Sequence, residues 1–264
     1  MKKTKKNGRL TTTVQDQTIE HNTFSASGHL EDAEACLKNY NSHIVSLIFQ
    51  KYDFNSGNRV LEFGAGLGTL AEMVRNRYDF SPVCVEIDSS FLKLLQDKDF
   101  VSFQSIYEIR DEKFDLVYSS NVLEHIKDDV AILKELREIM APSANLALYI
   151  PALKFLYSEH DRNIGHFRRY SRNEVRNKLD QAGFRVDHIR YSDSLGILPW
   201  YLLRFKTSTS SKQSNEQRLL RVYDRILFPI SRLLDSLGFK WVLGKNILVF
   251  ASIKVPTSNS DDFN

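Results

Sequence analysis

The feature that most constrains this chain is a run of alternating glycines directly after a short apolar segment. Residues 60–63 (VLEF) predict a buried strand, Gly64, Gly66 and Gly68 follow at once, and apolar residues at helical spacing begin at Leu70. Glycine allows positive φ angles and lets the backbone approach a bound molecule closely. Strand, glycine loop and helix in this order predict the ligand-binding turn of a doubly wound sheet, with the ligand beyond the C-terminal end of the strand.

The rest of the chain alternates between short apolar segments and amphipathic ones. Further strands are predicted at 82–87, 100–103, 114–119, 146–150, 184–189 and 246–252. Helices are predicted at 31–51, at 128–140 and at 219–237, the last of them split or kinked at Pro229. A further helix is predicted to begin with Ser89 as its N-cap. Another is predicted to begin at a capping box formed by Ser171 and Glu174 and to end at about residue 182. This order predicts an α/β fold with a doubly wound, mostly parallel seven-stranded sheet, an N-terminal helix and a C-terminal helical lid insertion.

Composition and segment polarity predict one folded unit between two tails. With 264 residues and a 42% apolar fraction, the chain can bury a sizeable core. We expect a single domain over 26–255, with the lid at about 195–240 and a flexible loop at 207–217 inside it. Residues 1–25 are expected to form a flexible tail and 256–264 a disordered one.

Charge and cysteine usage point to a reducing compartment and away from nucleic acid. The net charge of +3 is small for this length, and Cys36 and Cys84 are far apart in the sequence. No apolar run has the length of a membrane span, and no apolar segment follows the lysines near Met1. These patterns favour a cytoplasmic protein.

The spacing of the glycines and of one carboxylate indicates which ligand the turn binds. A dinucleotide fold uses G-x-G-x-x-G, whereas this chain has an acid in the strand, Glu62, followed by G-x-G-x-G. Glu86 lies near the end of the next predicted strand, about 20 residues on, where a carboxylate can bind ribose hydroxyls. The pattern closely resembles the first two motifs of the class I S-adenosylmethionine-dependent methyltransferases. The resemblance implies a Rossmann-like methyltransferase fold and S-adenosyl-L-methionine as the cofactor.

Segment 114–126 is similar to the fourth-strand motif of the same family, F-D-x-V followed by L-E-H-I. By this resemblance Asn121 and Leu123 contact the methionine end of the cofactor, while Glu124 and His125 open the following helix. The third strand departs from the pattern, because Ser105 stands where relatives place an acid against adenine. The complete set of expected cofactor residues is Glu62, Gly64, Ala65, Gly66, Gly68, Glu86, Ile87, Ser105, Ile106, Asn121 and Leu123.

Segment 150–170 is the most individual part of the chain. It resembles the "VPA…LY…D…GH-x-RRY" segment of a bacterial methyltransferase subgroup often associated with glycosyltransferases and with cell-envelope sugar or lipid metabolism. The likeness extends to 191–200 and 244–249 and covers roughly 35–254. It implies that 150–170 lies over the transferring methyl group and forms part of a site for a small-molecule or lipid-linked acceptor, with an oxygen of a sugar, a glycolipid or a related metabolite as the expected nucleophile.

Histidines in and near this segment are the candidate bases, since a hydroxyl nucleophile benefits from a group that titrates near neutral pH. His166 is the first candidate and His160 the second, and His125 is a third that could equally pack without chemistry. His166 could instead tie the loop down by hydrogen bonds. Glu159, His160, Asp161 and His166 fit no standard metal-site spacing, so no metal is predicted.

Arginine and tyrosine side chains of the same segment are candidates for binding the acceptor. Arg168 and Arg169 could clamp a carboxylate or phosphate, and Tyr157 and Tyr170 could stack on a ring. One arginine could equally pair with Glu159 or Asp161, and Tyr170 could be a hydrophobic staple before the capping box.

Residues 195–239 combine aromatic side chains with several arginines and permit two interpretations: a helical lid packed on the sheet, or a surface that contacts a membrane or a lipid-linked acceptor. A nicotinamide-dependent oxidoreductase on the same fold is the competing enzyme class, and a non-catalytic cofactor-binding scaffold is the other alternative. Nucleic-acid methylation is not expected, because the fourth strand lacks an Asn/Asp-Pro-Pro-Tyr-like motif.

Overall fold

A computed structural model describes residues 35–50, 57–203 and 213–255. The predicted tails at 1–25 and 256–264, and part of the predicted loop at 207–217, lie outside these residues. Within them, no helix combines the length and apolar character needed to cross a bilayer.

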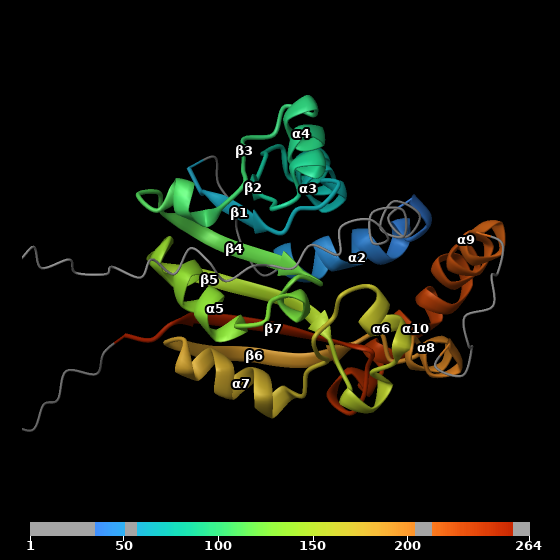
Figure 1. The fold of residues 1–264 in the computed structure, drawn as a ribbon. Coiled ribbons are helices and arrows are strands. Elements are labelled where there is room, and N and C mark those ends of the chain that lie inside the picture. The colour runs from blue at the N-terminus through green and yellow to red at the C-terminus, as the bar shows by residue number, and fades with distance from the viewer. Residues whose placement is uncertain (1–34, 51–56, 204–212, 256–264) are drawn as a thin grey trace, which may run out of the picture.

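The sheet has seven strands in the order β3-β2-β1-β4-β5-β7-β6 (Figure 1). All neighbouring pairs are parallel except those made by β7, which runs antiparallel to β5 and β6. This confirms the predicted mostly parallel, doubly wound sheet. The strands are β1 (Val60–Phe63), β2 (Val83–Val85), β3 (Ser102–Phe103), β4 (Phe114–Ser120), β5 (Met140–Pro151), β6 (Phe184–Ser192) and β7 (Asn246–Ile253).

The connections between strands are helical, as the alternating pattern predicted. The α-helices are α2 (Lys38–Phe49), α3 (Thr69–Tyr78), α4 (Ser89–Asp97), α5 (Asp129–Glu138), α6 (Glu159–Asn163), α7 (Arg172–Gln181), α8 (Ile197–Leu203), α9 (Gln213–Val222) and α10 (Phe228–Ser236). Short 3-10 helices are η2 (Ile106–Ile109), η3 (Leu123–His125), η4 (Lys154–Leu156) and η6 (Phe239–Trp241), and η5 (Tyr223–Leu227) is a π-helix. Helices α6, α8 and α10 gather at one end of the sheet (Figure 1).

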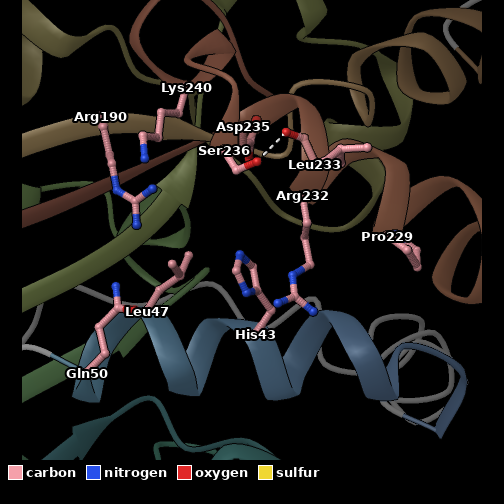
Figure 2. A pocket seen from close by; sticks show the side chains of 10 residues that line it. All are labelled: His43, Leu47, Gln50, Arg190, Pro229, Arg232, Leu233, Asp235, Ser236 and Lys240. Carbon is pink, nitrogen blue, oxygen red and sulfur yellow. Dashed lines mark hydrogen bonds between the residues drawn. The ribbon is translucent and has the colours of Figure 1, made fainter.

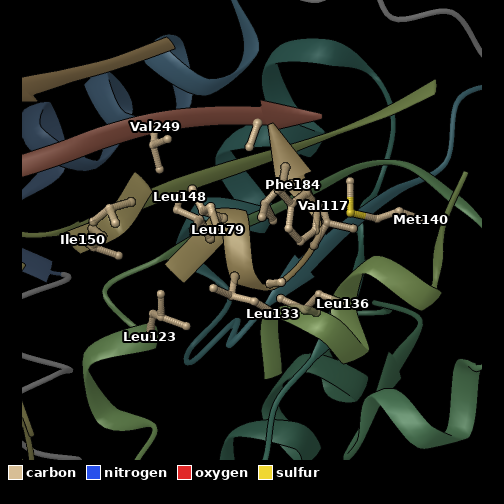
Figure 3. Packing of buried hydrophobic residues seen from close by; sticks show 14 of the residues in the cluster. Val117, Leu123, Leu133, Leu136, Met140, Leu148, Ile150, Leu179, Phe184 and Val249 are labelled. Carbon is tan, nitrogen blue, oxygen red and sulfur yellow. The ribbon is translucent and has the colours of Figure 1, made fainter. Parts of the chain in front are cut away.

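Alternate residues of the central strands bury opposite faces of the sheet, because successive side chains in a strand point to opposite sides. On one face, Val117 and Leu148 pack with leucines of α5 and α7 (Figure 3). On the other, Leu116 and Tyr149 pack with α2 and with Phe228 of α10. Leu123 belongs to the first cluster, so the segment after β4 is anchored directly in the core.

Two local predictions are corrected by the structure. The N-cap of α4 is Asp88, whose carboxylate accepts from the Ser90 and Phe91 amides, while Ser89 is already helical. Residues 213–217 of the predicted loop belong to α9. The helix changes its hydrogen-bond pattern ahead of Pro229, because α9 passes into the π-helix η5, and Pro229 stands in the first turn of α10.

Candidate functional site

The glycine loop closes tightly between β1 and α3. Gly64, Gly66 and Gly68 all have positive φ, at 76°, 54° and 81°. A Cβ at Gly64 would lie 2.3 Å from Cγ2 of Val122, so no side chain fits between the loop and the segment after β4. The backbone of the loop is therefore presented bare at the C-terminal end of β1, which fits a ligand that must approach it closely.

Glu86 connects the glycine loop to the end of β2. Its carboxylate accepts from the amide of Gly66 at 2.8 Å and from the amide of Asp88 at 2.9 Å. Burial raises the pKa of Glu86, and these two backbone hydrogen bonds partly oppose the rise. The neighbouring Ile87 is 48% exposed, an apolar surface beside the carboxylate. A carboxylate next to an exposed apolar side chain can bind ribose hydroxyls on one side and a base on the other.

The remaining expected cofactor residues differ in how accessible they are. Glu62 is buried inside the sheet and accepts from the Tyr118 hydroxyl at 2.8 Å, so it links β1 to β4. Ser105 N-caps η2: its hydroxyl oxygen accepts from the Tyr107 amide at 3.2 Å, and the Glu108 carboxylate accepts from the Ser105 amide at 2.9 Å to complete a capping box. Ala65 and Ile106 are buried.

Asn121 stands at the point where β4 ends. It has a positive φ of 54°, and its amide donates to the Tyr149 carbonyl at 2.8 Å, which holds the turn against β5. Leu123 follows in η3 and is buried in the core. The glycine loop, Glu86 and Asn121 all follow parallel strands at the same edge of the sheet, where ligands of this architecture bind.

Segment 152–170 forms a loop whose ends are tied together. Ala152 and Tyr170 form a bridge, with the Leu153 amide donating to the Tyr170 carbonyl and the Tyr170 amide donating to the Pro151 carbonyl. The Tyr170 hydroxyl is buried and donates to Asp129 at 2.9 Å. Asp129 also pairs with Arg168 and Lys178. The base of the loop is therefore fixed by a buried polar network.

Asp161 is the hub inside this loop. Its fully buried carboxylate accepts from the Ser158 amide, from Nδ1 of His166 at 3.0 Å and from Arg169 at 2.7 Å. Burial works to raise the pKa of Asp161, but the hydrogen bonds from His166 and Arg169 and the charge of Arg169 hold it well below its ordinary range. Asp161 is thus an ionised anchor that orients both the imidazole and the guanidinium.

Glu124 faces His166 from the other side. It is fully buried, and among the described residues neither carboxylate oxygen has a hydrogen-bond partner. Its Oε1 lies 3.7 Å from Nε2 of His166. Burial raises the pKa of Glu124 to about 8. The ring of His125 meets that of His166 edge-on, with 4.6 Å between centroids. Glu124, His125 and His166 therefore form one cluster, and Glu124 is the third residue after Asn121.

Comparison with protein families then identifies the chain. A family profile described as "Methyltransferase domain" matches residues 31–189, which is more than half of the sequence. The chain belongs to this methyltransferase family. A search of curated proteins returned no match.

Solved structures with the same fold include several methyltransferases at low sequence identity. A SAM-dependent methyltransferase from Archaeoglobus fulgidus is 17% identical, with a TM-score of 0.52 over 80% of this chain and 94% of its own. A possible histamine N-methyltransferase from Thermotoga maritima is 15% identical, with a TM-score of 0.55 over 86% and 94%. Phosphoethanolamine N-methyltransferase 2 from Haemonchus contortus, solved with S-adenosyl-L-methionine, is 16% identical, with a TM-score of 0.57 over 88% and 58%.

The family and these structures confirm the predicted Rossmann-like methyltransferase fold, and membership of the family confirms S-adenosylmethionine as the expected cofactor. The assignments of single cofactor residues remain predictions. The methyltransferase brings the glycine loop, Glu86, Ile87 and Asn121 to one edge of the sheet, whereas Glu62 lies inside the strands.

The structure corrects two of the predicted acceptor contacts. Tyr170 is buried and its hydroxyl serves Asp129, so it has no free face for a ring. Arg169 is also buried and pairs with Asp161, which confirms the structural alternative for one arginine. Arg168 pairs with Asp129 as well but is partly exposed, and Tyr157 donates to the His166 carbonyl. Both stay candidates for the acceptor.

Residues that sequence reasoning missed lie in the same loop. Phe155 and Phe167 are 52% and 54% exposed, and the candidate base His160 packs edge-on against Trp200 of α8, 5.3 Å between centroids. Trp200 also lies over Arg169. The two phenylalanines of this segment are visible in the sequence, whereas their exposure is shown by the structure. The isolation of Glu124 had no signal, because it depends on how the loop packs.

A separate cavity of about 480 Å³ lies between α2 and α10, away from the glycine loop. Arg190, Arg232 and Lys240 surround it together with His43 and Asp235 (Figure 2). Burial and the nearby Arg232 and Arg190 lower the pKa of His43 to about 4, so the histidine is neutral at physiological pH. The cavity includes none of the predicted cofactor residues. Its arginines and lysine suit an anion.

Proposed function

We propose that this methyltransferase transfers the methyl group of S-adenosylmethionine to an oxygen atom of a small-molecule or lipid-linked acceptor, such as a sugar, a glycolipid or a related cell-envelope metabolite. The cluster of Glu124, His125 and His166 carries the proposal, because it lies directly after the turn at Asn121 where the reacting methyl is expected. The resemblance of segment 150–170 to the glycosyltransferase-associated subgroup supports the acceptor class.

The cofactor supplies an electrophilic methyl group on a sulfonium ion. The acceptor oxygen forms the new bond to carbon, the carbon–sulfur pair stays on sulfur, and the hydroxyl proton leaves to a base or to water. The main contribution of the chain is to align oxygen and methyl and to exclude water. The glycine loop, Glu86 and Asn121 would hold the cofactor, while the exposed Phe155 and Phe167 offer apolar faces to a ring or a lipid chain.

His166 is the strongest candidate base. Asp161 accepts from its Nδ1, and a carboxylate can only accept, so that nitrogen carries a proton. In the neutral ring Nε2 then has the lone pair, turned toward Glu124. His160 lies against Trp200 instead, and His125 is on the exposed side of the cluster.

Calorimetric titration with S-adenosylhomocysteine, and with NAD as the control ligand, tests the cofactor assignment first. Micromolar binding of the former and none of the latter is expected. Binding of NAD alone would support the oxidoreductase alternative, and binding of neither would support a scaffold. Radiolabelled methyl transfer to a panel of sugars, glycolipids and carboxylates then tests the acceptor, with the His166→Ala variant expected to lose turnover and keep its affinity for S-adenosylhomocysteine.

The C-terminal helices support a second proposal, contact with an anionic membrane surface. An exposed apolar stripe runs along α9, η5 and α10, where side chains recur at helical spacing: Leu219, Val222, Ile226, Ile230, Leu233 and Leu237. Exposed arginines stand one position before four of these side chains, at Arg218, Arg221, Arg225 and Arg232. Apolar side chains edged by arginine suit the interface of a bilayer with acidic headgroups.

The cationic cavity adjoins this stripe, because Leu233 belongs to both and the neighbouring Arg232 lines the cavity. A headgroup phosphate could therefore enter between Arg190, Arg232 and Lys240 while the stripe rests on the acyl chains. Such contact would place the methyltransferase as a cytoplasmic, membrane-peripheral protein close to lipid-linked acceptors.

Co-sedimentation with vesicles of phosphatidylcholine alone or with added phosphatidylglycerol tests this surface. Binding to the acidic vesicles, weakened by salt and by Ile226→Asp, is expected. Val101→Asp is the matched control, since Val101 is also exposed but lies beside β3. If the wild type does not sediment with acidic vesicles at low salt, the lid packs on the sheet without contacting lipid.

A further inference from the structure

The cluster beside the expected methyl position has the composition of a metal site. Within the described part of the chain, one carboxylate oxygen of Glu124 and one ring nitrogen each of His125 and His166 all lie within 4.8 Å of one another. The tetrahedral geometry of a zinc ion with bonds of about 2.1 Å separates its ligand atoms by about 3.4 Å. The 3.7 Å between Glu124 and His166 is close to this value, so rotamer adjustments rather than backbone movement would complete the set.

The hydrogen bonds around the cluster prepare both imidazoles to bind a cation. Asp161 accepts from Nδ1 of His166, which leaves the lone pair of Nε2 pointing toward Glu124. His125 is hydrogen-bonded to the backbone of Gly165, and a Cβ at that glycine would lie 3.5 Å from its Nδ1. A carboxylate or carbonyl behind each histidine is the usual support of a metal-binding imidazole, because it fixes the tautomer and the ring orientation.

Glu124 provides the second, independent observation. A fully buried carboxyl group without hydrogen-bond partners among the described residues is costly in either protonation state, since a buried polar group requires hydrogen bonds and a buried charge also requires a counter-charge. Nε2 of His166 lies 3.7 Å from its Oε1, a distance too long for a hydrogen bond. A divalent cation between the three side chains would supply the missing partner.

We propose that Glu124, His125 and His166 bind a divalent first-row transition metal ion. Two nitrogens and one carboxylate oxygen suit Zn²⁺ or Co²⁺, whereas Mg²⁺ and Ca²⁺ prefer sites made of oxygen alone. Glu124 closes the buried side and His125 is exposed, so the remaining coordination positions open toward solvent. Resting on the proposed transfer to oxygen, these positions would bind the acceptor oxygen next to the reacting methyl, and the metal would then replace Nε2 of His166 as the group that favours loss of the hydroxyl proton.

The competing explanation is a proton in place of the metal. The proton would be held by Glu124 itself, whose pKa burial raises to about 8. The two explanations differ in what the purified protein binds, because a proton-held cluster has no affinity for a transition metal beyond that of ordinary surface histidines.

Direct metal titration of the full-length protein, after removal of any histidine tag, tests the proposal. One Co²⁺ per chain should bind, with a visible absorption band from nitrogen and oxygen ligands, and Zn²⁺ should displace it. Glu124→Gln and His125→Gln should each weaken binding at least tenfold. His160→Gln is the matched control, because His160 belongs to the same loop but stacks on Trp200, and it should bind metal as the wild type does.

Thermal unfolding gives a readout that does not depend on activity. Zn²⁺ should raise the Tm of the wild type and of His160→Gln, and leave the Tm of Glu124→Gln unchanged. Failure of the wild type to bind Co²⁺ or Zn²⁺ with one-to-one stoichiometry would refute the site, as would wild-type affinity for metal in Glu124→Gln and His125→Gln.

Titration with S-adenosylhomocysteine separates this inference from the proposed function. Cofactor binding without metal binding would refute the metal site alone. Glu124-dependent metal binding without cofactor binding would refute the proposed function and leave the site in place.

Discussion

Replacing Gly64 with alanine should destabilise the methyltransferase by about 2–5 kcal/mol. The first contribution is conformational, since φ at Gly64 is +76° and an L-residue in the left-handed region costs about 1–2 kcal/mol. The second is steric, because the new Cβ would lie 2.3 Å and 2.8 Å from the two γ carbons of Val122. Overpacking of this kind costs about 1–3 kcal/mol.

Two further variants separate the contributions. Gly238 also has a positive φ, +108°, but a Cβ there would meet nothing within 4 Å, so Gly238→Ala should cost only the conformational part, about 1–2 kcal/mol. Val122→Ala removes both clashing carbons. Combined with Gly64→Ala, it should therefore recover the steric part, a favourable coupling of about 1–3 kcal/mol in a double-mutant cycle.

Urea unfolding followed by the fluorescence of Trp200 and Trp241 measures all four variants against the wild type. The reasoning is refuted if Gly64→Ala loses no more stability than Gly238→Ala, or if Val122→Ala adds its own loss without any recovery. Either result would mean that the segment after β4 yields to the loop, and that glycine is not needed there for close approach.

Three other perturbations test separate parts of the structure. Glu86→Ala should weaken S-adenosylhomocysteine binding at least tenfold, about 1.4 kcal/mol, and unchanged affinity in calorimetry would contradict the ribose assignment. Burial works to raise the pKa of Asp129, but hydrogen bonds from Lys178, Arg168 and Tyr170 outweigh it and lower the pKa below the ordinary value of 3.8. The stability that ionised Asp129 contributes is therefore present above pH 3.8 and is lost as the pH falls below that value. Asp129→Asn should accordingly have a lower free energy of unfolding than the wild type at pH 7, and the difference should shrink in acid. A difference in urea unfolding that stays the same at all pH values would exclude this. Tyr223→Phe should cost about 1–3 kcal/mol, because the hydroxyl donates to the buried Asp193, and a loss below about 0.5 kcal/mol in urea unfolding would show that the bond contributes little.

Sequence reasoning succeeded where the physical cause is local. The glycine loop, the carboxylate after β2 and the change of helix ahead of Pro229 each depend on a few adjacent residues, and the structure has them where they were expected. Asp88 and Ser89 show the limit of this approach. Both are good N-caps, and only the end point of β2 decides that Asp88 is the one outside the helix.

The buried network of segment 152–170 could not be predicted in the same way. Which arginine pairs with Asp161 is decided by the folded loop, in which Arg169 contacts Asp161 and the Ala152 carbonyl while Arg168 pairs with Asp129. The isolation of Glu124 is equally a product of tertiary packing. In the sequence it is one residue of a common motif, and only the folded loop reveals that it lacks hydrogen-bond partners among the described residues.

The buried and the exposed side chains of segment 152–170 differ in how freely they can be substituted. Removing Asp161 would leave Arg169 as an unpaired buried charge, a change that costs about 3–5 kcal/mol, so the hub tolerates little substitution. Phe155 and Phe167 are exposed on the same loop and belong to neither buried hydrophobic cluster of the sheet faces. Substitutions there can alter contacts with an acceptor at small cost to the fold. Acceptor specificity is therefore expected to depend on the exposed aromatic residues of the loop, while Asp161 and Arg169 keep the imidazole of His166 in place.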